Sequence, residues 1–357
     1  MQSFASDSDN VSALADNGWQ AMRLGDSPGE QRETCEASEG RARVAVRENF
    51  HVAGIGELLW DLFPTHRRLG GAPTNFAYHC GQLGATALPV SCLGADPLGM
   101  EVRDTLEQMG VDTTYLAESE EYPTGTVEVA LHEGKPTYDI REDVAWDHIP
   151  WTGALEALAG RLDAVCFGAL AQRSGESRRT IRAFLECVPD DALKIFDVNL
   201  RQAFSSRRLI RDSLASANVL KLSDEELPVL AGYLDLTGSP GDPLEQLTQV
   251  RERFDLRLVA FTRGIDGSVL LSESEIVESP RLPVKAVDSV GAGDSFTAAL
   301  CIAVLSEWPL EAVSAFANEV ATFVCSQQGA TPKLPAELTR RGFARGRAAA
   351  EKEHQET

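Results

Sequence analysis

The residues best suited to chemistry lie in the segment Gly291-Ala292-Gly293-Asp294. An Ala-rich stretch with helical spacing follows it, so both glycines fall where a loop enters a helix. Without Cβ atoms, two glycines let backbone N–H groups converge on an anion, and the first turn of a helix adds N–H groups without an intrahelical partner. The segment therefore predicts an anion hole for a transferring phosphoryl group.

Asp294 stands directly behind this anion hole. A carboxylate there could take the proton from a hydroxyl that attacks the phosphorus, which contributes roughly two to four orders of magnitude in rate. Asp also caps helices, and these four residues alone do not decide between a base and a cap. No Gly-Lys-Ser/Thr stands in a suitable place, which argues against a P-loop NTPase.

A second polar segment reads Leu69-Gly70-Gly71-Ala72-Pro73-Thr74-Asn75. Two glycines before a helix predict a tight turn, and Asn75 in the first helical turn offers an amide donor and a carbonyl acceptor to a polyol. Taken alone, such a turn is more often structural. Together with the first segment it indicates a site for a hydroxyl-bearing acceptor.

The elements that position these segments follow an alternating pattern of strands and helices. Buried strands are predicted at 50–56, 86–93, 163–168, 193–198, 218–222 and 257–262, and helices at 74–83, 98–109, 176–187, 206–216, 224–231 and 243–254. Strands joined by helical crossovers predict an α/β fold whose mostly parallel sheet is covered on both faces. Residues 57–69 and 124–140 instead alternate polar and apolar side chains, which predicts a small half-exposed β-sheet.

The two ends of the chain differ from this core, which spans 49–335. Residues 1–48 are polar, without sustained periodicity, and predict a disordered extension; a regulatory or targeting segment is the alternative. Residues 336–357 are basic and Ala-rich and predict a C-terminal helix or tail.

The net charge of −21 argues against a nucleic-acid partner. The apolar runs are too short to span a bilayer, there is no secretion signal, and the seven cysteines form no metal motif. We therefore expect a cytoplasmic protein with free thiols.

The segment Asp288-Ser-Val-Gly-Ala-Gly-Asp294 resembles the D-[ST]-x-G-A-G-D signature of the ribokinase-like (PfkB-type) carbohydrate kinases, and Gly70 to Asn75 resembles their G-G-x-x-x-N signature. The resemblance covers roughly 50–335 and is strongest to bacterial fructokinase-type members. It implies a three-layer αβα domain with a small β-sheet lid. It also implies that Asp294 is the base and that Gly291, Ala292 and Gly293 form the anion hole. Sugar hydroxyls would bind at the positions Asp61, Gly70, Gly71 and Asn75.

The nucleotide side rests on smaller matches to this family. Thr262-Arg-Gly264-Ile-Asp-Gly267 resembles its T-x-G-x-x-G turn, and Asn318 matches a position near the adenine. Asp197-Val-Asn-Leu-Arg201 resembles a strand end where Arg201 would meet phosphate or substrate. Lys221 would face phosphate. For both cations a solvent-facing position is the alternative.

The resemblance also implies metal ions, with one departure. The family commonly has N-x-x-E where this chain has Ser223-Asp-Glu-Glu226, so Glu226 would organise water ligands of Mg²⁺ without the Asn. A monovalent cation, K⁺, would bind at Asp288 and Val290, with Gly329 and Ala330 positioned to contribute.

The resemblance implies an ATP-dependent sugar kinase that phosphorylates a hydroxymethyl group, with fructose to fructose 6-phosphate as the leading reaction. Ribose, a nucleoside or 2-keto-3-deoxygluconate are alternative acceptors. A sugar-binding scaffold of the same fold without catalysis is the alternative from a different class. Family members often pair through the lid, so a homodimer is expected.

Overall fold

The structure, a computed structural model, describes residues 49–132, 135–238, 242–280 and 282–342. The predicted disordered extension at 1–48 lies outside these residues. Of the predicted C-terminal helix or tail, residues 336–342 are helical and 343–357 lie outside. No helix within the described ranges is long and apolar enough to cross a membrane. The six cysteines described there are free thiols, and four of them are buried.

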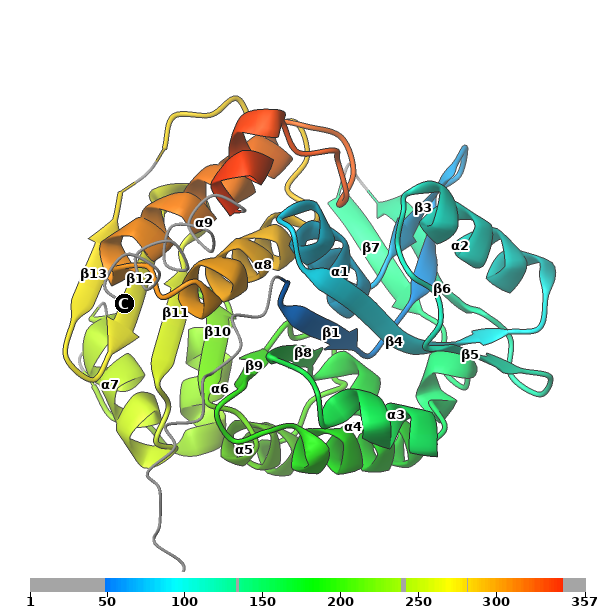
Figure 1. The fold of residues 1–357 in the computed structure, drawn as a ribbon, viewed down its shortest axis with the longest axis horizontal. Helices are drawn as coiled ribbons and strands as arrows, with labels where there is room; N and C mark the ends of the chain where they lie inside the picture. Colours follow the sequence, from blue (N-terminus) through cyan, green and yellow to red (C-terminus); the bar gives the residue numbers. More distant parts are fainter. Residues whose placement is uncertain (1–48, 133–134, 239–241, 281, 343–357) are drawn as a thin grey trace, which may run out of the picture. The chain divides into compact units, whose positions relative to one another are not determined.

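A nine-stranded sheet runs through the domain in the order β13-β12-β11-β10-β9-β8-β1-β4-β5 (Figure 1). The strands are β1 (His51–Ile55), β4 (Thr86–Gly94), β5 (Leu116–Ser119), β8 (Ala164–Gly168), β9 (Leu193–Asp197), β10 (Val219–Ser223), β11 (Leu258–Thr262), β12 (Ser268–Ser272) and β13 (Ile276–Ser279). All pairings from β5 to β11 are parallel, whereas β12 and β13 are antiparallel. The mostly parallel sheet is therefore confirmed. Its antiparallel edge was not predicted, and it arises because the connection from β11 to β12 is too short for a helical crossover.

Helices cover both faces of this sheet, as predicted. On β8, Ala164 and Cys166 join the core beneath α1 (Ala72–Gln82), α8 (Ala292–Leu305) and α9 (Leu310–Cys325). Val165 and Phe167 point the other way, into the core beneath the second helical layer. That layer comprises α3 (Gly153–Ala159), α4 (Gly175–Cys187), α5 (Arg207–Ala215), α6 (Leu227–Leu234) and α7 (Pro243–Arg253). The described residues also form three short 3₁₀ helices, η1 (Ala145–His148), η2 (Leu170–Gln172) and η3 (Gly264–Asp266).

The smaller sheet expected beside the main domain is present, in the order β3-β2-β6-β7. It consists of β2 (Leu59–Leu62), β3 (Arg67–Gly70), β6 (Gly125–His132) and β7 (Lys135–Ile140). Trp60 on β2 and Leu58, which precedes β2, pack with α2 (Pro97–Gln108) in a core of their own. In Figure 1 this sheet and α2 project to one side of the large sheet.

The strand order reverses direction at β1, which lies between β8 and β4. Chain connections leave β1 toward opposite edges of the sheet, so the carboxyl end of β1 is a topological switch point, where open α/β sheets bind ligands. The segment that follows β1 carries Glu57 and Asp61 and leads to the turn before α1. The fold thus delivers the predicted acceptor segment to the place where a cleft is expected.

Candidate active site

The N-terminus of α8 is open, and its two glycines are required by close contacts. Gly291 is the N-cap residue with φ of 78°, in the left-handed region, and no side chain caps the helix. A Cβ atom on Gly291 would lie 2.5 Å from Cα of Ala330, and one on Gly293 would lie 2.9 Å from Nζ of Lys221. Backbone on one side and an ammonium group on the other therefore approach the first-turn N–H groups, as an anion site requires.

Asp294 lies in the first turn of α8, but it does not cap the helix. Its carboxylate Oδ2 accepts a hydrogen bond of 2.8 Å from Nδ2 of Asn75 on α1. Burial and the neighbouring carboxylate of Asp197 raise the pKa of Asp294 to about 6, while Asn75 and Lys221 act in the opposite direction. A carboxylate with this pKa is ionised at neutral pH and is a better proton acceptor than an exposed Asp.

Lys221 lies beside Asp294 and is buried, so the solvent-facing alternative is wrong for this residue. Its Nζ lies 3.1 Å from Oδ1 of Asp197, whose Oδ2 accepts a hydrogen bond of 3.0 Å from Thr297. Burial opposes the charge of the ammonium, yet the carboxylates of Asp197, Glu226 and Asp294 raise the pKa of Lys221. Lys221 is therefore a fixed positive charge behind Gly293.

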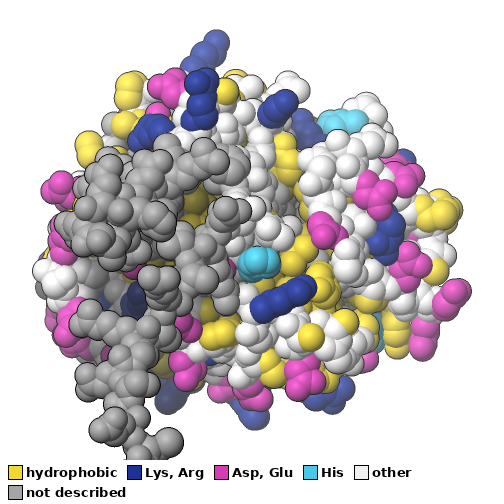
Figure 2. All heavy atoms as spheres, in the orientation of Figure 1, with side chains coloured by type: hydrophobic (Ala, Val, Ile, Leu, Met, Phe, Trp, Pro, Cys, Tyr) yellow, Lys and Arg dark blue, Asp and Glu magenta, His cyan; other side chains and the backbone are white. Residues whose placement is uncertain are grey.

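This charge is a local feature of the interior. On the face drawn in Figure 2, the visible Lys and Arg side chains of the described residues are scattered among Asp and Glu and form no continuous basic area on that face. With a net charge of −21 the whole protein repels anions. An anionic ligand must therefore be attracted by the buried ammonium and the open helix end.

The predicted acceptor residues lie together on the other side of Asp294. Asp61 on β2 is paired in register with Arg68 on β3, and a Cβ atom on Gly70 would lie 2.9 Å from Oδ2 of Asp61. Burial raises the pKa of Asp61 to about 6, against the opposing charges of Arg201 and Arg68. Gly71 has φ of 124°, and a Cβ atom there would lie 2.4 Å from the carbonyl oxygen of Glu57. The two glycines thus bring the backbone of the turn close to the Asp61 carboxylate and to the chain after β1.

Arg201 is exposed, in contrast to Lys221. Its Nη1 donates a hydrogen bond of 2.9 Å to the carbonyl of Leu200, and its charge lowers the pKa values of Asp61 and Asp294. The guanidinium therefore lies close enough to the two carboxylates to influence both. Its exposure leaves it available to a ligand.

Sequence reasoning missed Glu57, which follows β1 directly. Glu57 is buried, and burial together with the smaller effect of the Asp294 charge raises its pKa to about 7. Its Oε2 atom has no hydrogen-bond partner within the described residues. The available signal was a polar residue at the end of the first parallel strand, the position where such sheets bind ligands. Glu57 therefore adds another carboxyl group beside Asp294 and Asp61.

The predicted nucleotide residues lie further along the same edge of the sheet. Thr262 ends β11 opposite Ser268, and Asn318 on α9 donates a hydrogen bond of 2.7 Å to Oγ of Ser268. Gly264 and Gly267 have φ values of 52° and 89°, and a Cβ atom on Gly267 would lie 2.1 Å from the carbonyl oxygen of Ser279. Thr262, Gly264 and Gly267 thus form one turn between β11 and β12, and Asn318 reaches the start of β12 from α9.

The residues present fit Mg²⁺ only as an ion that keeps most of its waters. No group of three or more His, Cys, Asp or Glu side chains could hold a metal in the described ranges. Glu226 accepts hydrogen bonds of 2.8 Å from the backbone N–H groups of Leu200 and Ser223, one on each oxygen. Each oxygen keeps a lone pair for a water ligand, and phosphate oxygens would supply the rest.

The carboxylate of Asp288, predicted to bind K⁺, is surrounded by hydrogen-bond donors. Its Oδ1 accepts from the N–H of Val290 at 3.1 Å, and its Oδ2 accepts from the N–H of Gly329 at 3.1 Å and from Nη1 of Arg68 at 2.6 Å. A guanidinium thus already balances the carboxylate predicted to bind K⁺. These contacts do not fit an additional monovalent cation.

Comparison with known protein families identifies the family of this chain. The sequence model described as pfkB family carbohydrate kinase matches residues 52–337. The chain belongs to the pfkB family of carbohydrate kinases. As a member of this family it is a phosphotransferase with an alcohol group as acceptor.

The matches to individual relatives span almost the whole length of those relatives. A fructokinase of Salmonella typhimurium is 30% identical over 80% of this chain and 97% of the relative, and one of Klebsiella pneumoniae is 29% identical over 79% and 95%. Among solved structures, an uncharacterized sugar kinase of Pyrococcus horikoshii in complex with ATP superposes with a TM-score of 0.68. It is 27% identical, over 82% of this chain and 99% of that chain.

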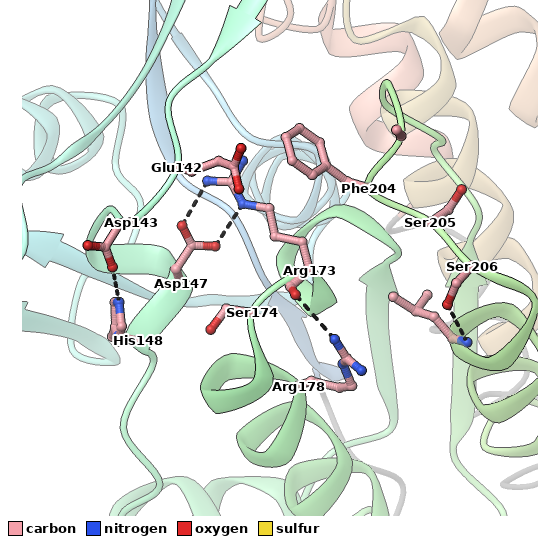
Figure 3. Close-up of a pocket in the computed structure, with 12 residues that line it drawn as sticks. Glu142, Asp143, Asp147, His148, Arg173, Ser174, Arg178, Phe204, Ser205 and Ser206 are labelled. Atoms are coloured by element: carbon pink, nitrogen blue, oxygen red, sulfur yellow. Dashed lines mark hydrogen bonds and ion pairs between the residues drawn. The ribbon is translucent and has the colours of Figure 1, made fainter.

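A separate pocket of about 440 Å³ lies between η1, the start of α4 and the start of α5 (Figure 3). At its wall Arg173 forms two hydrogen bonds of 2.8 Å with Asp147, and His148 contacts Asp143. None of the residues that line it is one of the predicted site residues. The catalytic assignment therefore rests on the contacts around Asp294 rather than on cavity size.

Proposed function

We propose that this pfkB-family kinase transfers the γ-phosphoryl group of ATP to a hydroxymethyl group of a small sugar, with fructose to fructose 6-phosphate as the leading reaction. The observation that carries the proposal is the hydrogen bond between Asn75 and Asp294. It joins the predicted acceptor turn to the predicted base, directly beside the open N-terminus of α8. The fructokinases at about 30% identity support fructose as the acceptor.

The acceptor would lie between Asp294 and the turn Gly70–Asn75. Asp61 and the amide of Asn75 would bind its hydroxyl groups, and the Oδ1 atom of Asp294 would accept the hydrogen of the reacting hydroxyl. The oxygen then forms a bond to the γ-phosphorus while the bond to the β-phosphate oxygen of ATP breaks. The proton remains on Asp294 and ADP leaves.

The anion hole would stabilise the charge on the transferring group. The N–H groups of Gly293 and Asp294 and the ammonium of Lys221 are fixed before the reaction, so they need no rearrangement as charge develops. Thr262, Gly264, Gly267 and Asn318 would line the nucleotide. Mg²⁺ would be held through waters near Glu226, with Ser223 in place of the family Asn, and would neutralise phosphate charge.

Closure of the small sheet over the sugar would exclude water and protect ATP from hydrolysis. An exposed Tyr138 on β7 supports pairing of two copies through this lid, which a sedimentation measurement would test. The free thiols support a reducing, cytoplasmic location.

The test is a coupled ADP-release assay with a panel of fructose, ribose, nucleosides and 2-keto-3-deoxygluconate. We expect ADP release with fructose. If ADP is released only with another acceptor, the substrate changes and the proposed kinase reaction stands. Asp294→Asn should lower kcat by roughly two to four orders of magnitude. Asp104→Asn, an exposed residue on α2, is the control and should retain full activity.

The scaffold alternative predicts a different pattern. Wild type and Asp294→Asn would both bind sugar in calorimetry, and neither would release ADP. Equal turnover by the two proteins would show that Asp294 is not the base.

A further inference from the structure

Arg68 connects the small sheet to the loop that precedes the anion hole. It lies on β3, and its Nη1 donates to Oδ2 of Asp288, 220 positions away in the sequence, at 2.6 Å. Its neighbour Arg67 points elsewhere and pairs with Glu101 on α2. The side chains of Arg68 and Asp288 are only 34% and 16% exposed, so water screens their charges partly.

Asp288 in turn organises the backbone that supports Gly291. Its carboxylate binds the N–H groups of Val290 and Gly329, which holds the two loops together. Ala330, the next residue, packs against Gly291 so closely that no side chain fits between them. Any shift of Asp288 would therefore be transmitted to the first turn of α8.

A second contact fixes the same loop from the acceptor side. Nε2 of His79 on α1 lies 2.9 Å from the carbonyl oxygen of Ala330. Since a carbonyl only accepts, Nε2 carries the hydrogen. The segment from β3 through α1 therefore contacts the region around the start of α8 at three points. These are Arg68 with Asp288, Asn75 with Asp294 and His79 with Ala330. Arg68 is the one of these three that belongs to the small sheet.

We propose that Arg68 is a positioning residue that makes closure of the small sheet and organisation of the anion hole a single event, and that its guanidinium takes the place of a monovalent cation at Asp288. This inference rests on the proposed kinase function. Both oxygens of Asp288 accept N–H donors, and a second cation beside the guanidinium would be repelled. A fixed side chain thus supplies the positive charge, so activity requires no K⁺.

The inference is tested by assaying wild type, Arg68→Ala, Arg68→Lys and the matched control Arg67→Ala in KCl and in tetramethylammonium chloride at equal ionic strength. Wild type and Arg67→Ala should show the same kcat/KM in both salts. Arg68→Ala should lose about tenfold in kcat/KM, the order expected for one charge-assisted contact. KCl should restore part of that loss, and Arg68→Lys should retain most of the activity because it keeps the charge.

Thermal melting of the same four proteins in the two salts gives a readout that needs no turnover. Only Arg68→Ala should melt at a higher temperature in KCl, because only its Asp288 is free to bind K⁺. A wild type that requires K⁺ for activity, or that KCl specifically stabilises, would overturn the replacement of the cation. An Arg68→Ala variant as active as Arg67→Ala would overturn the positioning role. Absence of turnover by every protein with every sugar would instead refute the proposed function, and the melting curves would still decide on K⁺.

Discussion

Nδ2 of Asn75 lies 2.8 Å from Oδ2 of Asp294, although the two residues are 219 positions apart in the chain. The contact joins α1 to α8, the helix that begins with the predicted anion hole. It also orients the carboxylate, because one of its two oxygens is held. Four predictions follow from the surroundings of this pair.

The first concerns the pH dependence of kcat/KM. Asp294 must be ionised to accept a proton, and burial raises its pKa to about 6. Activity should therefore be constant above this value and fall toward about tenfold per pH unit well below it. Burial also raises the pKa of Asp61 to about 6, so Asp61→Asn is the control. Asp61→Asn should have a higher KM and should still lose kcat/KM at acidic pH. If the acidic fall in kcat/KM disappears in this variant, it reports Asp61 rather than Asp294.

The second concerns the stability cost of Glu57. An unfolded Glu loses its proton near 4.5 and the folded Glu57 near 7, so the folded state binds more protons between these values. Stability contributed by this group is thus lost as pH rises through that window. Glu57→Gln should therefore gain melting temperature relative to wild type at pH 8, but not at pH 4. Glu120→Gln, at an exposed position, should show no such pH-dependent difference.

The third concerns Gly291. Its left-handed backbone and the 2.5 Å approach to Ala330 leave no room for a methyl group. Gly291→Ala should lower the free energy of unfolding by about 1–3 kcal/mol and greatly reduce kcat. Gly232→Ala in α6, where a Cβ atom meets no neighbour, should instead stabilise the protein by up to about 1 kcal/mol. Urea titrations measure the free energy of unfolding of both variants. Equal changes in the two would contradict the close contact of Gly291 with Ala330.

The fourth concerns the buried ion pair of Lys221 and Asp197. Lys221→Met leaves a buried carboxylate without its cation and should destabilise the fold by about 3–5 kcal/mol. Adding Asp197→Asn should recover part of this loss, while activity stays low because the ammonium beside Gly293 is absent. The pair of Lys194 and the fully exposed Asp190, 3.8 Å apart, provides the control, since Lys194→Met keeps an apolar stem and should cost well under about 1 kcal/mol. Denaturation and ADP-release assays of all three variants measure both effects.

The sequence predicted the main fold because its signals are local. Alternating apolar runs and helical periods identified the parallel strands and most helices, and the period-two stretches identified the small sheet. The edge strands β12 and β13 and the short elements β5 and α3 lacked comparable signals. The start of α6 was predicted too early, at 224, because the turn before Leu227 is held by the Glu226 carboxylate rather than by helical bonds.

For the site, the sequence by itself determined the kinds of groups present: a glycine-rich helix start, a carboxylate behind it and a Gly-Gly turn followed by an Asn. It could not decide whether Asp294 caps its own helix, since that depends on a partner 219 positions away. Only the tertiary structure placed Lys221 in the interior, revealed Glu57 and brought Arg68 to Asp288. Burial and long-range pairing set these properties, and both arise only when strands distant in sequence lie side by side.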